Sequence, residues 1–164
     1  MAKIIALCGK ICSGKSTYAA ELAQKHRAVV LNPDVLMKTL FGEHLGARHE
    51  EVFASVQQYL YQQAKAIAGV GIDVVLDFGL WTQAARRETR AFFEMEGVDF
   101  AIHYVNTPLH RIRLNIEKRN GCVDETQYFI DDAILEKCLS RFEEPTADEI
   151  DLEVHFDACD ECDV

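Results

Sequence analysis

The sequence lacks several features that would place it in other classes of protein. Its 164 residues contain no uninterrupted apolar run of about 18, so no transmembrane helix and no membrane partner are expected. Residues 1–3 lead directly into an apolar segment and leave no room for a cleavable signal, which favours a cytoplasmic location. The six histidines show no metal-ligand spacing, and no repeat, low-complexity tract or linker divides the chain. We therefore expect one compact domain.

The chain also has no excess of basic residues. It contains 27 acidic residues and 17 Lys and Arg residues, which give a net charge of −10. The imbalance is local. Residues 143–164 carry ten acidic residues and no Lys or Arg, which leaves residues 1–142 with equal numbers of acidic and basic residues. The acidic block is typical of a solvated tail. A neutral body does not favour nucleic acid as a partner, although this alternative stays open.

Cysteine is present, but its placement argues against a disulfide framework. Of the six cysteines, Cys8 ends the first apolar run and Cys12 lies in the glycine-containing loop that follows. Cys159 and Cys162 have a redox or metal spacing, yet no second ligand pair accompanies them in the acidic block. We interpret these thiols as incidental.

Residues 9–16 read G-K-I-C-S-G-K-S and match the pattern G-x-x-x-x-G-K-[ST] of a phosphate-binding loop. A β-rich apolar run precedes the motif and a helical pattern follows it, which is the setting that the motif requires. Small residues let backbone N–H groups wrap the phosphates of a nucleotide at a helix N-terminus. Lys15 would reach the β and γ phosphates and Ser16 would bind Mg²⁺. The residues expected to hold the nucleotide are Gly9, Ile11, Cys12, Ser13, Gly14, Lys15, Ser16 and Thr17.

Hydrophobic patterning alternates strands and helices along the chain. Strands are predicted at residues 3–8, 28–31, 72–76, 100–105 and 152–156, the second and third as buried strands and the last as an edge strand. Helices are predicted at residues 15–25, 35–41, 50–67, 82–96, from 107 to about 119, and 124–142. This alternation predicts an α/β fold, a three-layer α/β/α sandwich around a parallel five-stranded sheet.

Two aspartates follow predicted strands, where open parallel sheets bind their ligands. Asp77 follows the apolar run ending in Val74-Val75-Leu76 and would hold Mg²⁺ with Ser16, unless it only forms a turn or cap. Asp34 follows the second strand and is the candidate general base for an acceptor hydroxyl. It could equally cap the next helix, and the two roles are compatible.

Arginines form two clusters. Arg86, Arg87 and Arg90 share helical spacing, which is usual for a solvated helix face. Arg119 lies near the end of a predicted helix, just before Asn120-Gly121, where a lid could bring its guanidinium over the phosphates. Arg111 and Arg113 are weaker candidates for the same role.

These motifs together resemble small P-loop kinases. The resemblance rests on the phosphate loop, Asn32-Pro33-Asp34, residues 76–81 with the arginines that follow, residues 106–108 with Arg119, and residues 141–145. The chain is similar to AAA-type ATP-binding proteins related to polynucleotide kinases, zeta toxins and chloramphenicol phosphotransferase. The resemblance covers residues 1–145, a kinase-like domain, and leaves residues 146–164 as an acidic segment with an edge strand. It implies that Asp34 is the catalytic aspartate and Arg119 the lid arginine.

One departure concerns the acceptor. Polynucleotide kinases of this type typically place an arginine three residues after the base, where this chain has Met37. We therefore expect an ATP- and Mg²⁺-dependent phosphotransferase that acts on a hydroxyl of a small-molecule acceptor, with Lys15, Asp34 and Arg119 as catalytic residues. A 5′-hydroxyl polynucleotide kinase and a non-kinase ATP-binding regulatory module are the alternatives. Neither the acceptor, the choice of ATP over GTP nor the oligomeric state follows from the sequence.

Overall fold

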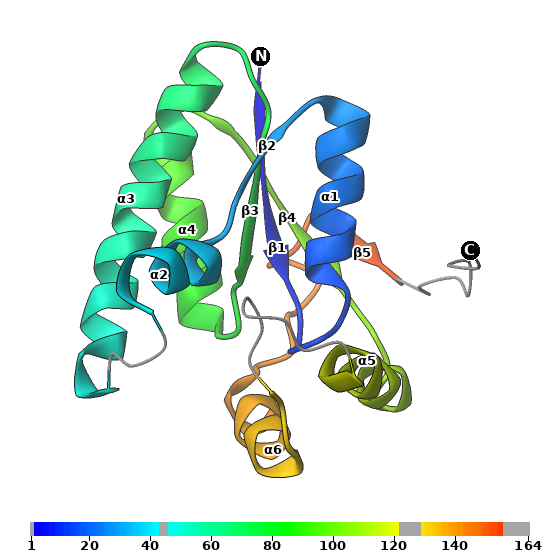
Figure 1. Ribbon diagram of the computed structural model, residues 1–164. Helices are drawn as coiled ribbons and strands as arrows, with labels where there is room; N and C mark the ends of the chain where they lie inside the picture. Colours follow the sequence, from blue (N-terminus) through cyan, green and yellow to red (C-terminus); the bar gives the residue numbers. More distant parts are fainter. Residues whose placement is uncertain (1, 43–45, 122–128, 156–164) are drawn as a thin grey trace.

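The computed structural model describes residues 2–42, 46–121 and 129–155. Its centre is a five-stranded sheet, all parallel, in the order β2-β3-β1-β4-β5 (Figure 1). The strands are β1 (Lys3–Cys8), β2 (Val29–Leu31), β3 (Val74–Gly79), β4 (Asp99–Val105) and β5 (Leu152–Val154). The central strand β1 pairs with β3 on one side and with β4 on the other.

The helices are α1 (Lys15–His26), α2 (Pro33–Phe41), α3 (His49–Gly69), α4 (Gln83–Met95), α5 (Leu109–Gly121) and α6 (Asp132–Arg141), with a short 3₁₀ turn, η1 (Gly46–Arg48). Helix α1 covers one face of the sheet, and α3 and α4 cover the other (Figure 1). This arrangement confirms the predicted three-layer α/β/α sandwich. No helix within the described ranges has the length and apolar character needed to cross a bilayer.

Strand β1 is apolar and buried after its first residue, Lys3, because both of its faces are covered. Successive side chains of a strand point to opposite faces, so Ile4 and Ala6 pack with α3 and α4, while Ile5 and Leu7 pack beneath α1. All four are almost inaccessible to solvent. The strand is therefore a rigid base for the loop that follows it.

The carboxyl edge of the sheet is the part of the fold that positions the site. After β1 and α1, the chain adds β2 and then β3 on one side of β1. Strands β4 and β5 extend the sheet on the opposite side of β1. Ligands of open parallel sheets bind where the strand order reverses in this way. Helices α5 and α6 lie beyond this edge (Figure 1).

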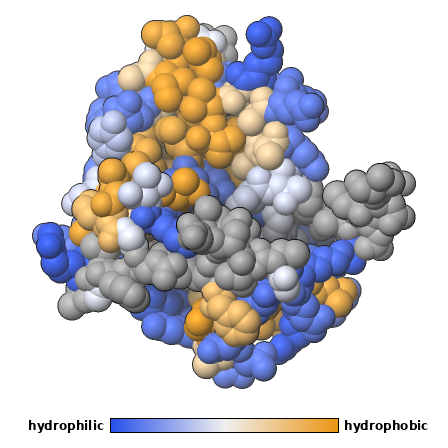
Figure 2. Space-filling view, in the orientation of Figure 1, coloured by the Kyte–Doolittle hydropathy of each residue, from blue (hydrophilic) through white to orange (hydrophobic). Residues whose placement is uncertain are grey.

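The prediction of a buried second strand is wrong. Strand β2 is an edge strand, and Val29 and Val30 are 37% and 38% exposed. Ile72, which we expected to begin the third strand, is also exposed and precedes β3. Figure 2 shows apolar residues gathered on this face, over β2 and the end of α3. The apolar run was correctly assigned to a strand, but exposure depends on the place of the strand in the sheet.

The predicted helix over residues 124–142 is shorter in the structure. Helix α6 begins at Asp132, and Asp131 caps it by accepting a hydrogen bond from the N–H of Ile134 at 2.8 Å. Residues 129–131 are not helical, and residues 124–128 lie outside the described part of the chain. Aspartate is a common N-terminal cap of a helix.

The acidic segment is not a solvated tail as far as it is described. Residues 152–154 form the predicted edge strand, β5, which pairs with β4. Asp151 accepts hydrogen bonds from Arg90 and from the backbone N–H of Ile102, and Glu149 pairs with Arg86. Residues 156–164, including Cys159 and Cys162, lie outside the described part. Residues 143–154 thus form a strap that ties α4 to the sheet.

Candidate functional site

The phosphate loop occupies the end of β1, and its glycines meet tight steric limits. The N–H of Gly9 donates to the carbonyl of Gly79 at 3.1 Å. A Cβ atom on Gly9 would lie 2.9 Å from the carbonyl oxygen of Val105. This oxygen belongs to the backbone and cannot rotate away as the end of a side chain could. Gly14 caps α1 with φ of +91°, a left-handed conformation that favours glycine. The loop conformation therefore requires glycine at both positions.

Lys15 opens helix α1 and folds back over the loop. Its Nζ donates to the carbonyls of Gly9, at 3.0 Å, and Lys10. Burial lowers the pKa of Lys15, while the charge of Asp77 acts in the opposite direction. The ammonium group therefore lies inside the concave side of the loop, where the sequence predicts the phosphates.

Ser16 and Asp77 meet as the sequence predicts. The hydroxyl of Ser16 donates to Oδ2 of Asp77 at 2.7 Å, and Asp77 is only 6% exposed. A hydroxyl and one carboxylate fit Mg²⁺, which is usually bound by one or two carboxylates together with phosphate oxygens and water. Among the described residues no three His, Cys, Asp or Glu side chains gather as a metal site. The donor set thus suits a metal that arrives with a nucleotide.

Asn32 belongs to the site, although the sequence analysis gave it no role beyond its place in the Asn32-Pro33-Asp34 motif. Its Nδ2 donates to Oδ2 of Asp77 at 2.9 Å, and its Oδ1 accepts from the N–H of Val35 at 3.1 Å. The second bond is an N-terminal cap of α2. Asn32 therefore joins the first turn of α2 to Asp77, the predicted metal ligand.

Asp34 lies in that first turn, at the surface of α2. Burial raises the pKa of Asp34, and the negative charge of Asp77 raises it further. The positive charges of His49, Lys15 and Arg119 act on the same carboxyl and oppose the increase. These couplings place the candidate base in the same electrostatic environment as the loop and Asp77.

Helix α5 supports the tip of the loop. Arg119 donates from Nη1 towards the sulfur of Cys12 at 3.7 Å, and its Nε is buried without a hydrogen-bond partner in the described residues. Asn115 donates to the carbonyl of Cys12 at 2.9 Å, and the buried hydroxyl of Thr107 donates to the carbonyl of Ser13 at 2.7 Å. The structure thus brings Arg119 against the loop, together with two residues that the sequence interpretation did not place there. Residues 122–128, into which a lid would continue, lie outside the described part.

The remaining predicted nucleotide-binding residues differ in how far their side chains are exposed to solvent. Ile11 and Cys12 pack their side chains against the apolar cluster of α5 and α6, and Ser13 is 1% exposed. Their backbone groups are therefore the parts that could face a phosphate. Thr17 is exposed in the first turn of α1.

The interpretation of Arg86 as part of a solvated helix face is wrong. Arg86 is 1% exposed and donates to the carbonyls of Leu80 and Glu143 and to the carboxylate of Glu149, at 2.9–3.2 Å. Burial would by itself raise the pKa of Glu149, but hydrogen bonds from Thr146 and Arg86 and the charge of Arg86 hold it at about 2. This buried pair fixes the strap behind the end of β3.

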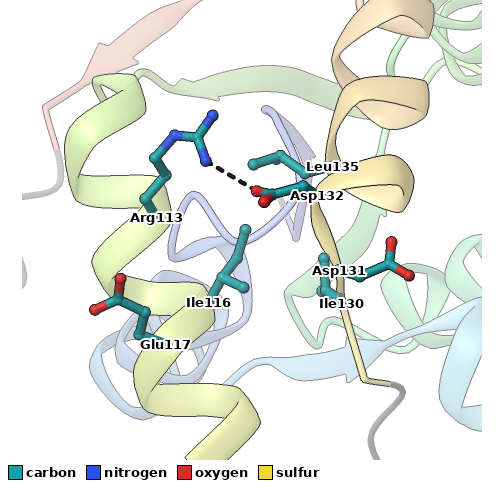
Figure 3. Close-up of a pocket in the computed structure, with 7 residues that line it drawn as sticks. All are labelled: Arg113, Ile116, Glu117, Ile130, Asp131, Asp132 and Leu135. Carbon is teal, nitrogen blue, oxygen red and sulfur yellow. Dashed lines mark hydrogen bonds and ion pairs between the residues drawn. The ribbon is translucent and has the colours of Figure 1, made fainter.

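A small pocket lies between α5 and α6 (Figure 3). Ile116, Ile130 and Leu135 form its apolar part, and Arg113 donates to Asp132 across it at 3.0 Å. Of the residues that the sequence analysis considered for the site, Arg113, a weaker candidate for the lid role, lines this pocket, and Lys15, Asp34, Asp77 and Arg119 do not. Its ion pair is exposed, which gives Arg113 a partner other than a phosphate.

A parallel sheet in the order β2-β3-β1-β4-β5, with a glycine-containing loop after β1, Lys15 and Ser16 at the start of α1 and Asp77 in β3, defines a kinase-like P-loop protein. A sequence profile of the AAA domain family matches residues 4–145, and the chain belongs to this family. A search of curated proteins finds no match.

Solved structures share the fold at low sequence identity. Kti12 of Chaetomium thermophilum, in complex with ADP-AlF3, superposes with a TM-score of 0.70 and 19% identity over 94% of this chain and 89% of that chain. A gluconokinase from Sinorhizobium meliloti 1021 gives 0.66 and 16% over 93% and 81%. The Mycobacterium tuberculosis APS kinase CysC, in complex with AMPPNP and APS, gives 0.64 and 19% over 93% and 87%.

Proposed function

We propose that the protein transfers the γ-phosphoryl group of ATP, with Mg²⁺, to a hydroxyl group of a small molecule. The observation that carries this proposal is the position of Asp34. A protein that only binds a nucleotide needs the loop and Asp77, whereas Asp34 is coupled electrostatically to Lys15, Asp77 and Arg119 from a separate helix. Two of the superposed structures are kinases by name, and two contain nucleotides, which supports ATP as the donor.

Each group has a distinct role in the proposed transfer. Asp34 takes the proton of the acceptor hydroxyl. The oxygen of that hydroxyl forms a bond to the γ phosphorus, while the bond between the γ phosphorus and the β–γ bridging oxygen breaks. Lys15 and Arg119 stabilise the negative charge on the transferring oxygens. Ser16 and Asp77 would hold Mg²⁺, which neutralises charge on the phosphates.

The test is a screen of phosphate acceptors with γ-labelled ATP and Mg²⁺. The panel includes sugars, sugar acids, nucleosides, antibiotics and an oligonucleotide with a 5′-hydroxyl, and transfer is scored against hydrolysis. Asp34→Asn should reduce transfer about 10²–10⁴-fold and leave ATP affinity intact, because a general base acts on the acceptor. Asp99→Asn, at an exposed position at the start of β4, is the matched control and should transfer at the wild-type rate.

The screen also separates the alternatives. Transfer to the oligonucleotide alone, with binding that weakens steeply as salt increases, would identify a polynucleotide kinase. Hydrolysis without any acceptor, at a rate that Asp34→Asn does not change, would contradict phosphotransfer and favour an ATP-binding regulatory module.

A further inference from the structure

Asn32 contacts both halves of the proposed site through one side-chain amide. Its Oδ1 caps α2, the helix that carries Asp34, and its Nδ2 donates to the carboxylate of Asp77. The same oxygen, Oδ2, receives the hydroxyl of Ser16. Two donors from different elements therefore converge on one oxygen of a buried carboxylate.

The chemistry of the partners fixes the orientation of the amide. Val35 offers a backbone N–H, which requires the oxygen of the amide, and Asp77 offers a carboxylate oxygen, which requires the nitrogen. The reversed amide would place a donor against a donor and an acceptor against an acceptor. Serine and aspartate are good caps, but an ionised aspartate has no proton to donate to Asp77, and the serine hydroxyl lies one bond closer to the backbone than Nδ2 of the amide.

The charge of position 32 also matters. Asp34 and Asp77 already repel each other, since the charge of Asp77 disfavours the ionised form of Asp34. A neutral donor between them satisfies Asp77 without adding a third negative charge. This explains why an amide, rather than a carboxylate, suits the junction of β2 and α2.

We propose that Asn32 is a positioning residue that holds Asp77 for the metal and sets the first turn of α2, and with it Asp34, against the metal-binding pair. The proposal rests on the proposed function, because it assigns Asp77 to Mg²⁺ and Asp34 to the acceptor. Residues that orient a metal ligand from behind typically change metal affinity by 10–100-fold when replaced.

The first experiment measures ATP binding by isothermal titration calorimetry at increasing MgCl₂, so that no acceptor is needed. Asn32→Ser keeps a cap on α2 but removes the amide nitrogen that contacts Asp77, and the shorter hydroxyl side chain does not extend as far. We expect the Mg²⁺ concentration for half-maximal enhancement of ATP binding to increase about tenfold. The melting temperature of the metal-free protein should stay close to that of the wild type, because the cap remains.

Two further variants separate charge from capping. Asn32→Asp keeps the cap and adds a negative charge. In EDTA it should therefore melt at a lower temperature than Asn32→Ser, and Mg²⁺ should raise its melting temperature by more. Asp131→Ala removes the equivalent cap of α6 and is the matched control. It should lower the melting temperature and leave the Mg²⁺ dependence of ATP binding unchanged.

The outcomes distinguish the two levels of the proposal. If the wild type binds ATP but Asn32→Ser shows the same Mg²⁺ dependence, Asn32 is only a helix cap and the inference is overturned. The same conclusion follows if Asn32→Asp and Asn32→Ser melt alike with and without Mg²⁺. A wild-type protein that binds no ATP overturns the proposed function itself, and the inference with it.

Discussion

At the residue scale, two glycines show how differently the same substitution acts. A methyl group on Gly9 would meet the backbone oxygen of Val105 and the hydroxyl of Ser13 at 2.9 and 2.8 Å. A methyl group on Gly69, at the end of α3, would meet no atom within 4 Å. The phosphate loop tolerates no side chain at its first position, whereas the helix end does.

We predict that Gly9→Ala reduces ATP affinity at least about tenfold, because the loop must move to relieve a backbone contact. Gly69→Ala is the control. It should bind ATP like the wild type and be equally stable or more stable, since alanine is about 1 kcal/mol better than glycine within a helix. Calorimetric titration with ATP and thermal unfolding measure both effects. Equal affinity in the two variants would contradict the steric argument.

Local pattern predicted some of the site residues and missed others. The roles expected of Lys15 and Ser16 follow from a contiguous motif, and the proximity of Ser16 to Asp77 follows from the meeting of strand ends in a parallel sheet. Asn32 and Thr107 lie in segments that carry the family resemblance, but no contiguous motif signals their contacts or that of Asn115. Their partners lie 45, 94 and 103 residues away in sequence, so an ordinary polar residue acquires its contact only when the sheet assembles.

At the scale of single elements, α4 and the strap depend on each other. The periodicity of α4 predicted that its arginines face solvent, because a helix pattern shows which residues share a face and not what covers that face. Here residues 143–154 cover it. Arg86 contacts two carbonyls and Glu149, and Arg90 contacts Asp151.

We predict that Glu149→Gln lowers the free energy of unfolding at pH 7 by about 3 kcal/mol, because it leaves a buried guanidinium without its counter-charge. Glu149 has a folded pKa of about 2 against an ordinary value of 4.5. Its contribution to stability is therefore complete above about pH 4.5 and is lost as the pH falls towards 2. The variant should lose this part of the pH dependence.

Urea unfolding at pH 7 and at pH 3 measures the effect. Asp132→Asn is the matched control, because its ion pair with Arg113 is exposed and should contribute less than about 1 kcal/mol. Equal losses in the two variants at pH 7, or an unchanged pH dependence in Glu149→Gln, would show that the buried pair does not stabilise the fold.

At the scale of the whole molecule, charge distribution and strand order are the two features to explain. Alternating strands and helices predicted the layers and the parallel sheet, because crossover connections constrain both. They did not predict which strands lie at the edges, so the exposure of β2 was missed. Composition likewise located the negative charge in the last 22 residues but could not show that several of these acids bind partners on α4 and β4.

We predict that a chain ending after Pro145 unfolds at a markedly lower temperature than a chain ending after His155. The shorter chain loses β5 and leaves Arg86 without Glu149, whereas the longer one keeps the contacts that the structure describes for the strap. Scanning calorimetry of both chains and of the full-length protein checks this. The longer chain serves as the control for truncation, and equal melting temperatures would contradict a structural role for the strap.

Gly79 ends β3 close to both the indole of Trp81 and the side chain of Lys15. Its φ is +82°, and a Cβ atom there would be 2.9 Å from Nε1 of Trp81 and 3.7 Å from Cε of Lys15. Trp81 is the single tryptophan of the 164 residues. All indole fluorescence of this protein therefore originates beside the lysine of the phosphate loop, and the chain carries its own optical probe at that point.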